Sequence, residues 1–263
     1  MVNFVAKFIL PILPQSLRLR IHLLRRYRDY VFLNKESLRY GEDGLYTFQA
    51  AAFLKEERFC KAYSLGEQTQ SWGGISIRWR IHVLLWGASC AARLPGAFVE
   101  CGVNRGGFAK AIIDYTAFER LEKQYYLFDT FTGFDVAQLN PEERVTIANS
   151  YQYDDCFSAV QTAFADKPFV KLVKGSVPGS LASVNVGPVA FLSIDMNCVA
   201  PEIATAKFFW PNLVAGGIIV LDDYGFSAHH LQKEAFDQLA REWNVEILSL
   251  PTGQGLIIKP GIQ

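Results

Sequence analysis

The chain has 263 residues, half of them apolar, and its 26 basic residues balance its 26 acidic ones. This length predicts one large α/β domain with an appendage, because two full domains would each have too few residues for a substantial core. The balanced charge argues against a nucleic-acid groove across the protein, so no nucleic-acid partner is expected, and no uncharged apolar run reaches the roughly 18 residues that span a bilayer.

The cysteines indicate a reducing compartment. They are odd in number and widely spaced, without the C-x-x-C or neighbouring histidines of a zinc site. We therefore expect reduced thiols, mostly in the core, in a cytoplasmic protein without a cleaved signal peptide. The five are Cys60, Cys90, Cys101, Cys156 and Cys198.

The first forty residues carry eight basic side chains and only two acidic ones. Between Leu17 and Leu38 apolar residues recur every three or four positions with arginines between them, which predicts a basic amphipathic helix. Packing on the domain or on a partner subunit, as in a homo-oligomer, is the favoured role. Peripheral contact with an anionic membrane surface is the alternative.

Residues 41–76 are interrupted by glycines and contain one predicted helix, Phe48 to Tyr63, before the glycine-rich segment Ser71 to Gly74. That segment suits a lid or a spacer. We place the domain boundary after residue 76, with an N-terminal helical extension over residues 1–76 and the main domain over residues 77–263.

From residue 77 onward strands and helices alternate. The predicted helices are 77–93, 108–121, 157–164, 203–210 and 231–243, and the predicted strands are 97–101, 125–128, 169–173, 189–194, 217–221, 245–250 and 256–259. Alternation predicts parallel strands with right-handed crossovers, and the last two strands predict an antiparallel hairpin at one edge. The expected fold is α/β, a seven-stranded Rossmann-like sheet with helices on both faces, whose ligand lies at the carboxyl ends of the strands.

The first strand of this domain leads into a glycine turn. Glu100 precedes Gly102, Arg105, Gly106 and Gly107, and a helix follows. The spacing lacks the G-x-G-x-x-G pattern of dinucleotide sites, which argues against a nicotinamide dehydrogenase. A carboxylate beside such a turn suits a ligand that carries an ammonium and a sulfonium, as S-adenosylmethionine does. A tight strand-to-helix turn explains the same residues.

The second strand ends in Asp129, Thr130 and Phe131. A carboxylate at this position accepts hydrogen bonds from ribose hydroxyls in Rossmann-like sheets, so we expect Asp129 to bind the cofactor, with Thr130 and Phe131 beside it. A turn-forming aspartate is the alternative, and Phe131 suits the core as well as a ligand wall. After the third strand, Gly175 and Ser176 offer a weaker prediction of contact with adenine.

The fourth strand ends in Asp195 and the fifth in Asp222 and Asp223. Adjacent parallel strands bring these carboxylates to one edge, where their repulsion favours a hard divalent cation, most simply Mg²⁺. Such an ion would lower the pKa of an acceptor hydroxyl and hold it in line with the methyl group. Turn formation and loop ordering are the alternative roles of these three residues.

These motifs together resemble the macrocin and mycinamicin type of sugar O-methyltransferases, within the class I S-adenosylmethionine-dependent superfamily. The resemblance covers roughly residues 78–260 and includes the segments 98–107, 128–133, 193–211, 216–225 and 253–259. It implies that the acidic glycine turn and Asp129 bind S-adenosylmethionine, and that Asp195, Asp222 and Asp223 hold magnesium. Asn197 and Val199 depart from the family pattern of a second acidic residue and an aromatic one after the fourth strand.

The sequence therefore predicts methyl transfer to a hydroxyl of a small, sugar-containing or other acceptor, as in secondary metabolite biosynthesis. Asp195, His229 and His230 are the candidate catalytic groups, because a histidine that titrates near neutrality suits general-base work. The two histidines also suit ordinary positions in the first turn of a helix. The rival hypothesis is a non-catalytic module that keeps the cofactor pocket and serves assembly or membrane-surface contact.

Overall fold

The structure is a computed structural model that describes residues 37–150 and 153–261. By its internal contacts the chain divides into two units, residues 1–39 and 40–263, and the second contains nearly all of the described residues. The predicted amphipathic helix of residues 17–38 lies almost wholly outside the described residues, so its roles stay predictions. No helix in the described ranges is long and apolar enough to cross a membrane. The boundary after residue 76 also stays a prediction, and it lies within the second unit.

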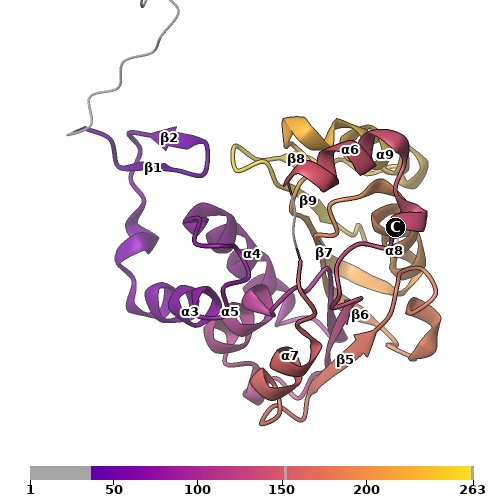
Figure 1. Ribbon diagram of the computed structural model, residues 1–263. Helices are drawn as coiled ribbons and strands as arrows, with labels where there is room; N and C mark the ends of the chain where they lie inside the picture. Colours follow the sequence, from indigo (N-terminus) through magenta and orange to yellow (C-terminus); the bar gives the residue numbers. More distant parts are fainter. Residues whose placement is uncertain (1–36, 151–152, 262–263) are drawn as a thin grey trace, which may run out of the picture. The chain divides into compact units, whose positions relative to one another are not determined.

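A seven-stranded sheet forms the centre of this unit (Figure 1). Its strand order is β5-β4-β3-β6-β7-β9-β8, and the neighbours from β5 to β7 are parallel, whereas β9 is antiparallel to both β7 and β8. The predicted fold class and the closing antiparallel pair are thus confirmed. The strands are β3 (Ala97–Cys101), β4 (Tyr125–Asp129), β5 (Val170–Lys174), β6 (Val189–Ile194), β7 (Leu213–Leu221), β8 (Leu248–Ser249) and β9 (Gly255–Ile258).

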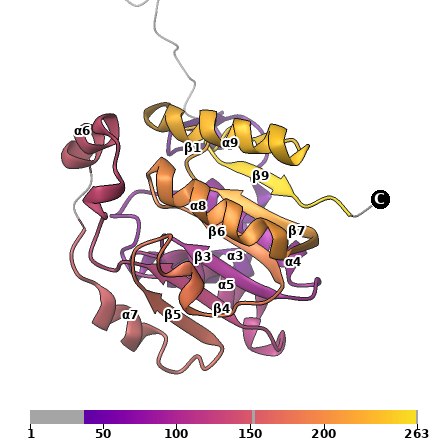
Figure 2. The same cartoon turned by 90° about the vertical axis from the view of Figure 1, so that its right-hand side faces the viewer.

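Helices cover both faces of the sheet, because successive side chains of its buried strands point to opposite sides. Phe98 packs among residues of the α4 and α5 side, while its neighbour Val99 packs with the α8 and α9 side. Figure 2 shows α8 and α9 in front of the sheet and α4 and α5 behind it. The helices are α3 (Glu57–Glu67), α4 (Arg78–Ala91), α5 (Gly107–Thr116), α6 (Pro141–Ser150), α7 (Phe157–Ala163), α8 (Val199–Phe209) and α9 (His230–Trp243).

The segment before α4 differs from the prediction. A two-stranded hairpin, β1 (Tyr40–Glu42) and β2 (Leu45–Thr47), turns at Asp43 and Gly44, which both have positive φ. The helix expected from Phe48 begins only at Glu57, because Glu56 is extended and separates it from a short 3-10 turn. The 3-10 turns are η3 (Ala52–Lys55), η4 (Phe118–Arg120), η5 (Val136–Gln138), η6 (Leu181–Ser183), η7 (Trp210–Asn212) and η8 (Ser227–His229).

Helix α6 was not predicted, although its start has a clear capping pattern. The Asn140 side chain accepts hydrogen bonds from the backbone N–H groups of Glu142 and Glu143, and Glu143 accepts one from the Asn140 N–H. Pro141 occupies the first helical position, where its missing N–H costs nothing. Weak amphipathic periodicity is what hid this helix from a search for apolar spacing.

Candidate active site

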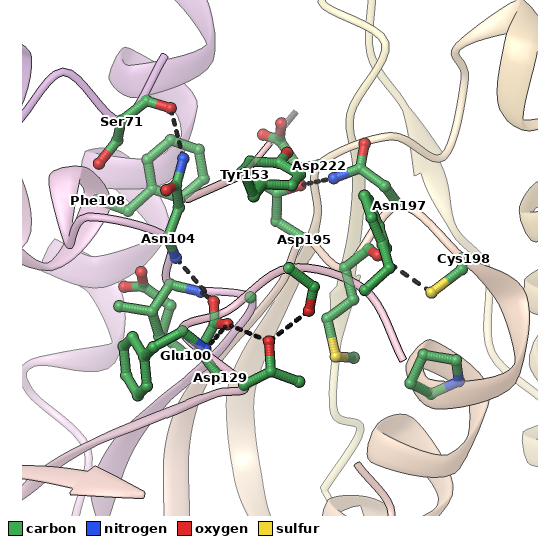
Figure 3. A pocket seen from close by; sticks show the side chains of 18 of the residues that line it. Ser71, Glu100, Asn104, Phe108, Asp129, Tyr153, Asp195, Asn197, Cys198 and Asp222 are labelled. Atoms are coloured by element: carbon green, nitrogen blue, oxygen red, sulfur yellow. Dashed lines mark hydrogen bonds between the residues drawn. The ribbon is translucent and has the colours of Figure 1, made fainter. Parts of the chain in front are cut away.

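A cavity of about 520 Å³ lies at the carboxyl ends of the central strands. Its wall includes residues that follow β3, β4, β5, β6 and β7, which is where a parallel sheet of this kind binds its ligands. Figure 3 shows Asn104 and Asp129 toward one side of the cavity and Asp195, Asn197 and Asp222 toward the other. The cavity therefore has two halves, one formed by residues at the ends of β3 and β4 and the other by residues at the ends of β6 and β7.

The glycine turn after β3 brings two strand ends close together. Gly102 has φ +90°, and a Cβ at this position would lie 1.8 Å from the carbonyl oxygen of Asp195. A side chain is excluded there both by the backbone conformation and by this contact. Gly102 lines the cavity, so the turn forms part of its floor.

The rest of the predicted turn has packing contacts. A Cβ on Gly106 would meet Phe164, and one on Gly107 would meet Trp72 and Ser71. Arg105 lies 3.9 Å from Asp154 in a solvent-accessible ion pair. Among the described residues that line the cavity, none of these three positions appears. Their predicted contact with a cofactor stays a prediction.

Asp129, at the end of β4, holds the glycine turn through backbone hydrogen bonds. Its Oδ2 accepts from the N–H groups of Val103 at 2.6 Å and Asn104 at 2.8 Å, and its Oδ1 accepts from Phe131 at 2.7 Å. Hydrogen bonds to a charged acceptor are stronger than neutral ones, so this carboxylate ties the ends of β3 and β4 together. Asp129 also lines the cavity, as Thr130 and Phe131 do.

Glu100 lies within β3 and is almost fully buried. The Tyr125 hydroxyl donates to its Oε2 at 2.7 Å, while its Oε1 is buried and has no hydrogen-bond partner among the described residues. Burial raises the pKa of Glu100 to about 8, despite the Tyr125 hydrogen bond. An orphaned acceptor in the cavity wall fits a ligand that brings a positive charge or a donor.

The segment before α4 covers the α5 side of the cavity. The side chain of Asn104 donates to the Ser71 carbonyl at 2.8 Å, and the Gly107 N–H donates to the Ser71 hydroxyl at 2.8 Å. Ser71, Trp72 and Gly73 line the cavity. Residues 71–73 therefore form part of the cavity wall, in the segment that we expected to serve as a lid or spacer.

On the other side, Asp195, Asp222 and Asp223 reach one cavity, as their strand-end positions predict. Burial, together with the neighbouring carboxylates, raises the pKa of Asp195 and of Asp223 well above the ordinary range. The Oδ2 atom of Asp223 is buried and has no hydrogen-bond partner in the described part of the chain. Gly175 and Ser176 also line the cavity, from the loop after β5.

Arg80 and Asp43, which were not predicted as site residues, complete this half. Arg80 of α4 donates from Nη1 to Asp222 Oδ2 at 2.8 Å and from Nε to Asp43 Oδ2 at 2.8 Å. Burial opposes the charged form, but Asp222 and Asp43 raise the pKa of Arg80 above its usual value. The sequence gives one weak indication that Arg80 is buried, because helical spacing places it beside the apolar residues Ile77, Ile81 and Leu84.

The hydrogen bonds of Asp222 argue against the predicted magnesium site. Asp222 uses one oxygen for Arg80 and the other for the side-chain amide of Gln254, which donates at 2.9 Å. Within residues 37–150 and 153–261, no group of three or more histidine, cysteine or acidic side chains has an arrangement that could hold a metal ion. The donors in this arrangement do not fit a resident divalent ion.

The two histidines proposed as bases lie elsewhere. Neither His229 nor His230 belongs to the described cavity wall. His229 is buried near Gln232, and burial lowers its pKa, while His230 is half exposed with its Nε2 3.6 Å from Glu142 Oε1. Of the three candidate catalytic residues, Asp195 is the one that lines the cavity.

A family model described as macrocin O-methyltransferase (TylF) matches residues 87–246, more than half of the chain. This chain belongs to that family. The methyltransferase is therefore an S-adenosylmethionine-dependent O-methyltransferase. A comparison with curated proteins gives no match.

Solved structures share the fold of this methyltransferase. The O-methyltransferase NovP matches with a TM-score of 0.59 and 18% identity, over 69% of this chain and 80% of its own. CalS11, described as a TDP-rhamnose 3′-O-methyltransferase of calicheamicin biosynthesis, gives 0.51 and 14%, over 88% and 97%. Podospora anserina PaMTH1, solved with S-adenosylhomocysteine, gives 0.55 and 16%, over 79% and 89%.

Proposed function

We propose that this methyltransferase transfers the methyl group to a hydroxyl of a sugar-containing small molecule, with the donor and the acceptor bound in the two halves of one cavity. The observation that carries the proposal is this cavity itself, which joins Glu100, Gly102 and Asp129 on one side to Asp195 and Asp222 on the other. The sugar acceptor is supported by membership of the macrocin O-methyltransferase family and by the similarity to CalS11, a TDP-rhamnose 3′-O-methyltransferase.

The donor half suits the chemistry of S-adenosylmethionine. When bound, this cofactor supplies a methyl group on a sulfonium, which an oxygen nucleophile displaces in line. In this proposal Glu100 offers a buried carboxyl oxygen to the cationic part of the cofactor, and Asp129 offers acceptor oxygens to the ribose hydroxyls. The backbone of Gly102 allows close approach. These assignments rest on position in the cavity and on charge.

Asp195 is the base that the geometry favours. Asp195 lines the cavity, and its backbone carbonyl lies against Gly102 of the glycine turn. We infer that its carboxylate takes the hydroxyl proton while the acceptor oxygen forms a bond to the methyl carbon and the carbon–sulfur bond breaks. Positioning of the two reactants supplies much of the rate enhancement in such a transfer.

Metal assistance stays a prediction and contributes no step here. Arg80 and Gln254 already occupy the two oxygens of Asp222, so a bound ion would have to displace them or share that carboxylate with a guanidinium. Turnover measured with and without a chelator shows whether the reaction needs a metal.

The test uses the full chain with S-adenosylmethionine labelled in its methyl group and a panel of sugar and phenol acceptors. We expect label in a hydroxyl of a sugar acceptor and calorimetric binding of S-adenosylhomocysteine. Asp195→Asn should lose turnover and keep cofactor binding, while the exposed control Asp166→Asn should keep both. Cofactor binding without transfer to any acceptor would favour the non-catalytic module, and tighter binding of NAD would contradict the cofactor assignment.

A further inference from the structure

Arg80 is fixed in the acceptor half by carboxylates on two sides. In addition to the bonds to Asp222 and Asp43 Oδ2, its Nη2 lies 3.2 Å from Asp43 Oδ1, so Asp43 binds the guanidinium through both oxygens. The Arg80 side chain is 14% exposed, and the side chains of Asp43 and Asp222 are 12% and 3% exposed. Two-point contact with Asp43 in a shielded site holds the cation in one orientation.

The Asp222 carboxylate, which accepts from Arg80, is equally constrained. Gln254 is fully buried, its amide N–H donates to Asp222 Oδ1, and its own carbonyl oxygen accepts from the Thr252 hydroxyl at 2.9 Å. The Asp222 carboxylate thus lies between a fixed cation and a fixed amide. A divalent ion on this carboxylate would lie close to the guanidinium, and like charges at short range in a shielded site repel strongly.

We propose that Arg80 takes the place of the divalent ion on the acceptor side, and that this chain transfers methyl groups without a metal. This inference rests on the proposed function. Of the five N–H donors of a guanidinium, three point at Asp43 and Asp222. The other two donors make no hydrogen bond among the described residues. They can donate to an acceptor oxygen as it loses its proton and so stabilise the negative charge that a metal would otherwise stabilise.

Removing this cation should uncover a metal site. Without Arg80, the four carboxylates of Asp43, Asp195, Asp222 and Asp223 would line the same cavity without a compensating charge, and they could then rearrange to hold a hard divalent cation through oxygen ligands. Arg80→Gln removes the charge and keeps a polar side chain. Arg80→Lys is the matched control because it keeps the charge.

The probe is Mn²⁺, followed by the loss of the free-ion signal in electron paramagnetic resonance. We expect the wild-type chain and Arg80→Lys to show no stoichiometric binding, and Arg80→Gln to bind at least about tenfold more tightly. Asp43→Asn removes one of the four carboxylates and keeps the guanidinium, so this variant should also show no stoichiometric binding. Turnover of the wild-type chain should be unchanged in a chelator.

Stoichiometric Mn²⁺ binding by the wild-type chain, with turnover that a chelator abolishes and Mn²⁺ restores, would overturn the inference. So would an Arg80→Gln variant that binds S-adenosylhomocysteine normally yet gains no affinity for Mn²⁺. Failure of the proposed function looks different, since the wild-type chain would then bind no S-adenosylhomocysteine or transfer no label, whatever its affinity for metal.

Discussion

The three backbone hydrogen bonds to Asp129 make Asp129→Asn the sharpest test of how the donor half is built. The carboxylate accepts from the N–H groups of Val103, Asn104 and Phe131 at 2.6–2.8 Å. Asparagine has nearly the same shape, but it has one acceptor oxygen where aspartate has two. If that oxygen faces Val103 and Asn104, the amide nitrogen must face the Phe131 N–H, and two donors then oppose each other.

The magnitude follows from these contacts. A hydrogen bond to a charged group contributes about 1.5–3 kcal/mol and one to a neutral group about 0.5–1.5 kcal/mol. Two bonds weaken by roughly 1 kcal/mol each and the third is lost, and because Asp129 is only partly buried, water can satisfy some of the loss. We expect the free energy of unfolding to decrease by about 2–4 kcal/mol, and cofactor affinity to fall by about tenfold or more.

Urea unfolding measures the first quantity, and calorimetric titration with S-adenosylhomocysteine measures the second. Asp166→Asn is the matched control, since Asp166 is exposed and contacts Lys167 on the surface, and it should match the wild-type chain in stability and in cofactor affinity. An Asp129→Asn variant as stable as this control, with unchanged cofactor affinity, would show that the carboxylate does not organise the turn.

Two further predictions concern the floor of the cavity. Since burial raises the pKa of Glu100 to about 8, the free protein holds this carboxyl protonated at pH 7, and a cationic ligand favours its charged form. Binding of S-adenosylmethionine should then release a proton, and its affinity should increase as the pH rises toward 8. In Glu100→Gln the affinity should not depend on pH in this way. Equal calorimetric heats of binding in buffers of different ionisation enthalpy would contradict this prediction. Gly102→Ala should cost at least about 3 kcal/mol of stability, because its Cβ would meet the Asp195 carbonyl at 1.8 Å, whereas the exposed Gly179→Ala has room. Equal melting temperatures of the two glycine variants would refute that reasoning.

Local sequence patterns were sufficient to predict the sheet and many of the residues that line the cavity. Apolar runs separated by helices predict the parallel strands. Because the carboxyl ends of parallel strands meet at one edge of the sheet, the sequence also predicts that Asp129, Asp195 and Asp222 lie at that edge. They do line one cavity. The prediction succeeded because strand direction alone determines which edge a residue after the strand occupies.

Pairings between distant segments were decided by the tertiary structure. The contact between Arg80 and Asp222 joins residues 142 positions apart, and no periodicity in either segment indicates it. The same holds for Glu100, whose orphaned oxygen and raised pKa come from the packing around β3, and for Gly106, whose neighbour Phe164 lies in a distant loop. Periodicity tells which face of an element is buried, but the charge state and the partners of a buried side chain depend on what the rest of the chain places against it.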